Sequence, residues 1–186
     1  TGTVKISGAQ AAIVNNTSGR QFYHLELNTT GAVSGTFFVD GHLTRTLGAT
    51  LDADISVKLD YKGAGGTTAG IGTIRFIGAG AQNFTNPNAP SVQINKSGGA
   101  LDIPANISVG GSWTHTAGTI TWNNKSVTFD NVNAAGVTIT TGTFYDVEIA
   151  KNPLYDVTLS GITTVSNQLT MTSLGNLNSI LVIPGI

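Results

Sequence analysis

Residues with side chains able to do acid–base or metal chemistry are few and widely spaced in this sequence. Its 186 residues include 10 Asp and Glu, 3 His and no Cys. The closest acidic pairs are Asp52 with Asp54 and Asp146 with Glu148. Enzymes that cleave polysaccharides use clustered carboxylates, and these pairs are isolated from one another along the chain. We therefore expect no enzymatic activity and no cofactor, with a polysaccharide-active β-helix that uses Asp52 and Asp54 as an alternative.

Asp146 and Glu148 form the best candidate for a metal contact. Residues two apart on a strand project from the same face, so both carboxylates would leave one turn of the chain on the same side, as His24 and Glu26 would elsewhere. A bridging Ca²⁺ ion is one interpretation, and two solvated side chains are the other. The three histidines show no shared spacing that indicates a metal site.

Two tryptophans, Trp113 and Trp122, flank the hairpin-like stretch 114–121. If both were exposed on one face, they would stack on sugar rings as aromatic platforms do in lectins. We therefore name them as candidate glycan contacts. The alternative is that at least one of them packs in the core.

Threonine pairs suggest a second kind of binding surface. Stacked in register, Thr-x-Thr pairs would form a flat array of hydroxyl and methyl groups of the kind that ice-binding solenoids use. Threonine is also a favourable outward residue on any strand, so ice binding stands as an alternative function. The pairs that recur with the repeats described below are Thr44/Thr46, Thr114/Thr116 and Thr170/Thr172.

Several Asn residues begin Asn-x-Ser/Thr sequences, the acceptor pattern for N-linked glycosylation. In a source that glycosylates its proteins, sugars at these positions would cover the outer surface and protect exposed strand edges. The alternative explanation is the Asn-, Ser- and Thr-rich composition itself. The candidate positions are Asn15, Asn16, Asn28, Asn83, Asn95, Asn106 and Asn124.

The composition excludes several classes of partner. Lys and Arg number 9 against 10 acidic residues, for a formal net charge of −1, so no basic surface is available for nucleic acid. The apolar runs are much shorter than the roughly 18 residues of a membrane-spanning helix, so we expect no membrane insertion. The lack of cysteine excludes disulfides and thiolate metal sites.

Short alternations of apolar and polar residues predict an all-β chain. They occur at 24–27, 56–59 and 91–94, separated by turns rich in Gly, Asn and Ser. The alternating segments recur roughly every five to ten residues, and units of about 55 residues then divide into coils of roughly 18 to 20. We predict a β-solenoid, similar to a parallel β-helix, with a β-sandwich or jelly roll as the alternative.

The coils group into three degenerate repeats within one domain. Leu25, Val92 and Val147 are aligned as equivalent positions, and a Gly-rich insertion at 61–71 accounts for the unequal spacing as a surface loop. The approximate copies are 1–60, 72–125 and 126–186.

The copies share a pattern that resembles a known class of repeat. Gly-Thr, an alternating Val or Ile strand and Gly-Ala stand at 2–9 and again at 72–79, followed in each copy by a Leu- or Val-containing strand. This succession resembles the Gly-, Thr- and Asn-rich repeats of large secreted surface proteins and adhesins of bacteria and archaea, which build β-solenoid stalks. The resemblance implies an extracellular or cell-surface location and a structural or adhesive role.

The ends of the chain carry apolar segments without a polar capping helix. An uncapped solenoid end exposes backbone groups and apolar side chains that can template another strand. We therefore expect copies of the chain or flanking repeats as partners, with cell-surface glycans as a further candidate. The favoured function is a non-enzymatic stalk, adhesin segment or self-assembling filament subunit, and the alternative is a glycan- or ice-binding module. The candidate assembly residues are Val4, Ile6, Ile180, Leu181, Val182 and Ile183.

Overall fold

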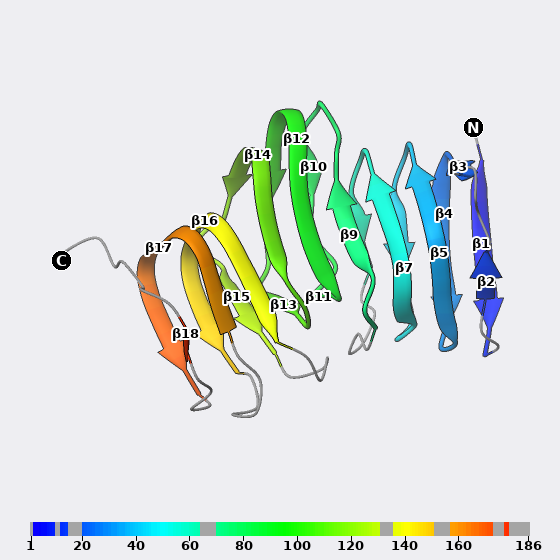
Figure 1. Ribbon diagram of the computed structural model, residues 1–186. Helices are drawn as coiled ribbons and strands as arrows, with labels where there is room; N and C mark the ends of the chain where they lie inside the picture. Colours follow the sequence, from blue (N-terminus) through cyan, green and yellow to red (C-terminus); the bar gives the residue numbers. More distant parts are fainter. Residues whose placement is uncertain are drawn as a thin grey trace.

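The computed structural model describes residues 2–9, 12–14, 20–63, 70–130, 136–150, 157–172 and 177–178. All regular structure in these residues is β-strand, and each strand pairing between them is parallel. Figure 1 shows the chain winding along one axis, with colours in sequence order from one end of the stack to the other. The predicted β-solenoid is therefore confirmed, and the sandwich alternative is wrong because parallel neighbours come from successive turns.

The strands form two parallel sheets that wrap a common interior. The smaller sheet has the order β1 (Thr3–Gly8), β4 (His24–Thr29), β6 (Leu43–Arg45), β8 (Tyr61–Lys62). The larger sheet has 14 strands, some of which are long and curved (Figure 1). Its members are β2 (Ala12–Val14), β3 (Arg20–Phe22), β5 (Ala32–Val39), β7 (Thr50–Val57), β9 (Thr73–Phe76), β10 (Gln82–Asn83), β11 (Asn88–Ala89), β12 (Ser91–Asp102), β13 (Ile107–Val109), β14 (Trp113–Thr121), β15 (Ser126–Phe129), β16 (Val137–Ile149), β17 (Val157–Met171) and β18 (Leu177–Asn178).

The length of one turn matches the predicted coil. In the small sheet Leu25 pairs with Leu43, and in the large sheet Ala89 pairs with Val109. The same spacing as the second pair returns near the end of the described chain, where Val157 pairs with Leu177. Each turn therefore places residues of the same sequence phase directly above those of the turn before.

The three-copy division stays a prediction, because the ladders repeat by single turns. Leu25, Val92 and Val147, which the sequence aligns as equivalent, lie in three different ladders, with Leu43, Trp113 and Leu169 as their respective partners. In the predicted insertion, β8 supplies Tyr61 and Lys62 to the small sheet, and residues 64–69 lie outside the described residues.

Strand alternation builds the core. In β4, Leu25 and Leu27 are fully buried, while His24 and Glu26 point outward and are half-buried. Successive turns cover the inward side chains and satisfy the backbone N–H and C=O groups of their neighbours. Burial of apolar surface at about 25 cal/mol per Å² is thus the main favourable term holding the turns together.

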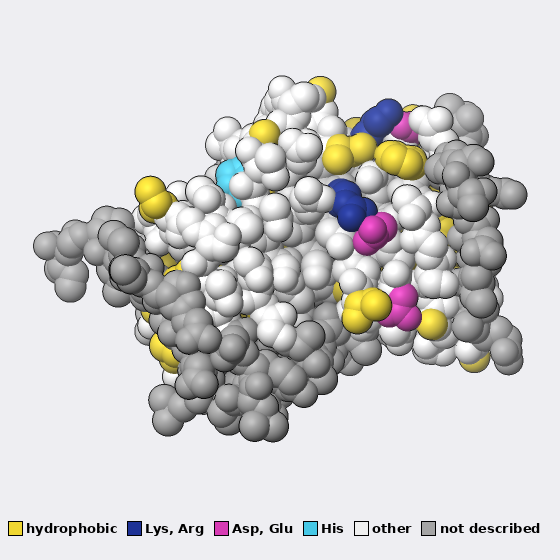
Figure 2. All heavy atoms as spheres, viewed as in Figure 1, with side chains coloured by type: hydrophobic (Ala, Val, Ile, Leu, Met, Phe, Trp, Pro, Cys, Tyr) yellow, Lys and Arg dark blue, Asp and Glu magenta, His cyan; other side chains and the backbone are white. Residues whose placement is uncertain are grey.

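Charged side chains are unevenly distributed along the solenoid. Figure 2 shows Lys, Arg, Asp and Glu side chains over the N-terminal half of the visible face, whereas the described surface over the C-terminal half is mostly uncharged. The ion pairs formed between described residues lie between residues 5 and 75. The charged side chains that could form a polar site therefore lie mainly in the N-terminal turns.

Candidate functional site

The outer face of the small sheet carries a column of titratable side chains. Leu25, Leu43 and Tyr61 are stacked inward, one from each of three successive turns. The residues just before them, His24, His42 and Asp60, therefore follow one another along the outside, one turn apart. The turn length thus brings together two of the three histidines and a carboxylate.

The two histidines are fixed by the backbone of the next turn. The His42 N–H donates to Nδ1 of His24 at 2.8 Å, and the Asp60 N–H donates to Nδ1 of His42 at 3.2 Å. The rings are stacked with centroids 5.1 Å apart and an interplanar angle of 2°. Since each Nδ1 accepts a hydrogen bond, each neutral ring carries its proton on Nε2.

A glycine is required beside His24. A Cβ on Gly41 would lie 2.3 Å from the Tyr23 carbonyl oxygen and 2.4 Å from Nδ1 of His24. Only glycine leaves room for the ring to approach the backbone of the next turn. This close approach fixes the position of the first ring in the column.

Asp60 ends the column and connects it to the following turn. Its Oδ1 accepts hydrogen bonds from the backbone N–H of Asn83 at 2.7 Å and from Asn83 Nδ2 at 3.1 Å, and Lys62 lies 3.1 Å from Oδ2. Burial raises the pKa of Asp60, but the hydrogen bonds from Asn83 and Lys62 outweigh it and lower the pKa overall. Asp60 therefore stays ionised.

The environment of His42 favours its neutral form. Burial lowers the pKa of His42, the positive charge of Lys62 lowers it further, and Asp60, with Oδ2 3.3 Å from Nδ1, opposes both. The net direction is downward, in agreement with a ring whose Nδ1 accepts a backbone hydrogen bond.

A second outward column runs beside the histidines. Its register is Lys5, Glu26, Thr44, Lys62, with Lys5 Nζ 2.7 Å from Glu26 Oε1. Thr44 is shorter than the residues on either side of it, and a groove of about 250 Å³ opens between the columns. The groove is lined by Thr3, His24, Leu25, Glu26, His42, Thr44 and Lys62.

Metal ligation is not evident in the described part of the chain, the histidine column included. No group of three or more His, Asp or Glu in the described residues is arranged to hold a metal ion. Asp146 accepts hydrogen bonds from Asn167 and Gln168, and Glu148 accepts one from Thr128 at 3.1 Å. These carboxylates connect turns to one another, and the calcium contact proposed for them stays a prediction.

Both tryptophans lie in the core, so their assignment as glycan contacts is wrong. Trp113 is 0% exposed and Trp122 is 8% exposed. Their ring centroids are 5.7 Å apart, each packs against Phe144, and Trp122 Nε1 donates to the Thr143 carbonyl at 2.6 Å. Trp113 is buried because strand alternation points it inward, in register with Val92 and Ile139.

The threonine pairs do not form one array. Thr44 lies between Glu26 and Lys62, Thr114 pairs with Gln93, and Thr170 pairs with Glu148. These positions belong to different ladders and have long polar neighbours. The recurring pairs therefore do not build the flat surface that ice binding requires.

The candidate glycosylation positions differ in accessibility. Asn28 and Asn83 are half-buried and hydrogen-bonded, and Asn83 Nδ2, the atom that would carry the sugar, donates to Asp60. The exposed positions are Asn95, Asn106 and Asn124, and Asn15 and Asn16 lie outside the described residues. Glycosylation itself stays a prediction.

The two ends of the described stack are incompletely covered. At the N-terminal end, Val4 is 46% exposed and Ile6 is half-buried on β1. The other predicted assembly residues, Ile180, Leu181, Val182 and Ile183, lie outside the described residues.

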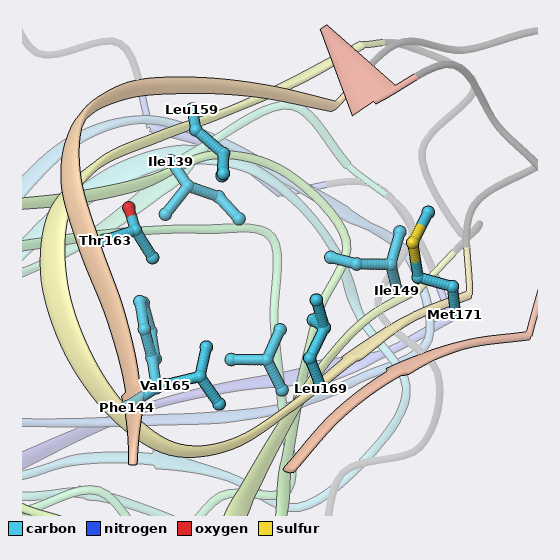
Figure 3. A pocket seen from close by; sticks show the side chains of 9 residues that line it. Ile139, Phe144, Ile149, Leu159, Thr163, Val165, Leu169 and Met171 are labelled. Atoms are coloured by element: carbon cyan, nitrogen blue, oxygen red, sulfur yellow. The ribbon is translucent and has the colours of Figure 1, made fainter. Parts of the chain in front are cut away.

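At the C-terminal end, apolar side chains of β16 and β17 point toward a shared interior, as Figure 3 shows. They enclose a hollow of about 20 Å³ lined by residues that include Leu159, Val165, Leu169 and Met171. This volume is about that of one water-sized probe, so the hollow is too small for a ligand.

The histidine column is the feature that the sequence reasoning missed. His24 and His42 are separated by one predicted coil length, and Asp60 follows after another. Applying that period to the titratable residues would have placed all three on one face. Metal-ligand spacings, which assume a helix or a short loop, could not reveal it.

Comparisons with known proteins gave no relatives. No protein-family model, no curated protein and no solved structure matches this chain. Among the described residues there is no helix with the length and apolar character needed to cross a membrane.

Proposed function

We propose that this protein is a non-enzymatic structural or adhesive protein of the cell exterior: a stalk, an adhesin segment or a filament subunit. The single observation that carries the proposal is the continuation of the parallel ladder past β17, where Val157 pairs with Leu177 in the same register as earlier turns. A ladder of this kind accepts further turns without change of geometry. The extracellular location rests on the resemblance to secreted surface repeats.

The partner that suits the C-terminal end of the described stack is another parallel solenoid turn, from a second copy or a flanking repeat. Leu169 and Met171 line the incompletely covered interior, and Met171 is 39% exposed. A further turn would cover these side chains and continue the parallel ladder that β18 begins on β17. A helix or an unrelated loop would not continue the parallel hydrogen-bond ladder.

Sedimentation velocity over increasing protein concentration, together with electron microscopy, tests this proposal. We expect end-to-end association that Met171→Lys abolishes, because it places a charge on the joining surface. Ile162→Lys is the matched control: Ile162 lies on the same strand, is 72% exposed and does not line the interior. A tandem fusion of two copies should appear as a single rod of about twice the length. Monomers at all concentrations, combined with two separately oriented rods in the fusion, would refute the proposal.

A further inference from the structure

The groove between the two outward columns has an arrangement of hydrogen-bonding groups that the stalk function does not use. Thr44 forms its floor, with Glu26 on the preceding turn and Lys62 on the following one. The stacked rings of His24 and His42 form the adjacent wall. The groove therefore lies across neighbouring turns of the small sheet.

The donors in this groove are held in place. Because Nδ1 of each histidine accepts a backbone N–H, each ring presents Nε2–H as its remaining polar group. Lys62 adds an ammonium group that is held by Asp60 at 3.1 Å, and Thr44 adds a hydroxyl that donates or accepts. Glu26 supplies the acceptor, and Lys5 holds its carboxylate from the far side.

The charges of the groove cancel. Lys5 is paired with Glu26 and Lys62 with Asp60, so the four groups sum to zero when both histidines are neutral. A site without net charge gives neither an anion nor a cation a long-range Coulomb attraction. A ligand that is uncharged and carries both donors and acceptors matches it best, which is the chemistry of a polyol.

We propose that this groove binds one neutral sugar unit of a polysaccharide. Its volume of about 250 Å³ lies below the ~300–1,000 Å³ of clefts that hold drug-sized ligands, which suits a single sugar ring. The hydroxyls of that ring would accept from the two Nε2–H groups and Lys62 and donate to Glu26. This binding does not depend on end-to-end association of the solenoid.

Titration by NMR and calorimetry with three classes of trisaccharide tests the proposal: neutral gluco, galacto and manno forms, a uronic acid form and an amino-sugar form. We expect a neutral form to bind, with amide shifts centred on Glu26, Thr44 and Lys62. Thr44→Arg fills the groove and should weaken binding at least about tenfold. Thr143→Arg, at an exposed position of β16, is the matched control and should leave binding unchanged.

Two substitutions at His42 separate binding from structure. His42→Asn keeps an acceptor oxygen near the Nδ1 position and removes the outward N–H, so it should weaken sugar binding about threefold to tenfold without loosening the Asp60 amide. His42→Gln keeps an outward amide donor and loses the inner acceptor, so Asp60 should exchange its amide hydrogen faster. Failure of every neutral trisaccharide to bind, binding only of a charged form, or binding undisturbed by Thr44→Arg would overturn the proposal.

Discussion

Two regions of the solenoid share one ladder geometry but are held by different contacts. The N-terminal turns contain β4, β6 and β8, and the C-terminal turns contain β14, β16 and β17. The N-terminal turns carry ion pairs outside and polar side chains inside. Arg45 is fully buried there, with its guanidinium donating to the Leu47 carbonyl, the Tyr61 hydroxyl and the Asn88 carbonyl at 3.1–3.3 Å. The C-terminal turns are filled by an aromatic cluster of Trp113, Trp122, Phe129 and Phe144.

In the N-terminal turns the polar contacts mainly define the register of the strands, whereas in the C-terminal turns the apolar contacts mainly provide stability. Charge pairs on an exposed face contribute only about 0–1 kcal/mol each, but a slip of one residue would move them into the core, so they define the register strongly. In the C-terminal turns, the β16–β17 pairing shifts register between Thr140 and Gly142 and again between Phe144 and Asp146. Apolar burial supplies the free energy of unfolding there, with fewer polar constraints on alignment.

Removing the centre of the aromatic cluster should have the largest effect. Trp113→Ala deletes a fully buried indole and should lower the free energy of unfolding by about 3–5 kcal/mol. Urea denaturation measures this change. Ile162→Ala, at a side chain 72% exposed, is the control and should stay within about 0.5 kcal/mol of the parent chain. Equal effects at the two positions would mean that the cluster does not stabilise these turns.

Two glycines with positive φ, one in each region, allow the tightness of stacking in the two regions to be compared. A Cβ on Gly63 (φ 119°) would meet the Arg45 backbone oxygen at 1.8 Å, whereas one on Gly161 (φ 127°) would meet the Thr141 hydroxyl at 2.5 Å. A side-chain hydroxyl can rotate away and a stacked backbone cannot. Gly161→Ala should therefore cost about 1–2 kcal/mol and Gly63→Ala more than that. The same denaturation assay decides the order, and the reverse order would contradict tighter stacking in the N-terminal turns.

Acid should destabilise the N-terminal turns, and we expect this effect to be smaller than those of the substitutions above. The folded-state pKa of His42 is lowered, first by burial and then by Lys62, so the unfolded chain takes up a proton before the folded chain does. The stability contributed by neutral His42 is complete above the ordinary value of 6.5 and is lost as the pH falls from there through the folded-state pKa. The protection factor of the Asp60 amide, which is its exchange rate compared with the intrinsic rate at the same pH, follows this change between about pH 7 and pH 5. His42→Asn, which has no proton to gain, should make this protection factor independent of pH, and a protection factor that still falls with pH in this variant would exclude His42 as the source.

The fold was accessible from the sequence because alternation and turn length are local properties. The pattern around Leu25 and Leu27 shows which face is inward, and the predicted coil length agrees with the spacing of partners in the ladders. Alignment of Leu25 with Val92 and Val147 does not correspond to a common ladder, because similar alternating segments occur on every side of the coil.

The candidate site was harder to predict because it depends on register between turns. His24, His42 and Asp60 are unremarkable one by one, and they form a site only when each turn stacks on the one before. Trp113 and Trp122 are amphipathic residues that suit either a core or a surface. Their burial follows from the phase of β14 and its neighbours, which composition does not reveal.

Successive turns stack in parallel register, and a disulfide between two of them tests this stacking most directly. The chain has no native cysteine, so a double substitution gives an unambiguous readout. Thr138 and Thr158 are ladder partners on β16 and β17, and adjacent strands lie within the ~4.4–6.8 Å Cα range of disulfides. Thr138→Cys with Thr158→Cys should form an intramolecular bond under mild oxidation, while Thr138→Cys with Ser126→Cys, which lies in another ladder, should keep both thiols free. Free thiols in the first protein, or a bond in the second, would contradict the stacked-turn account.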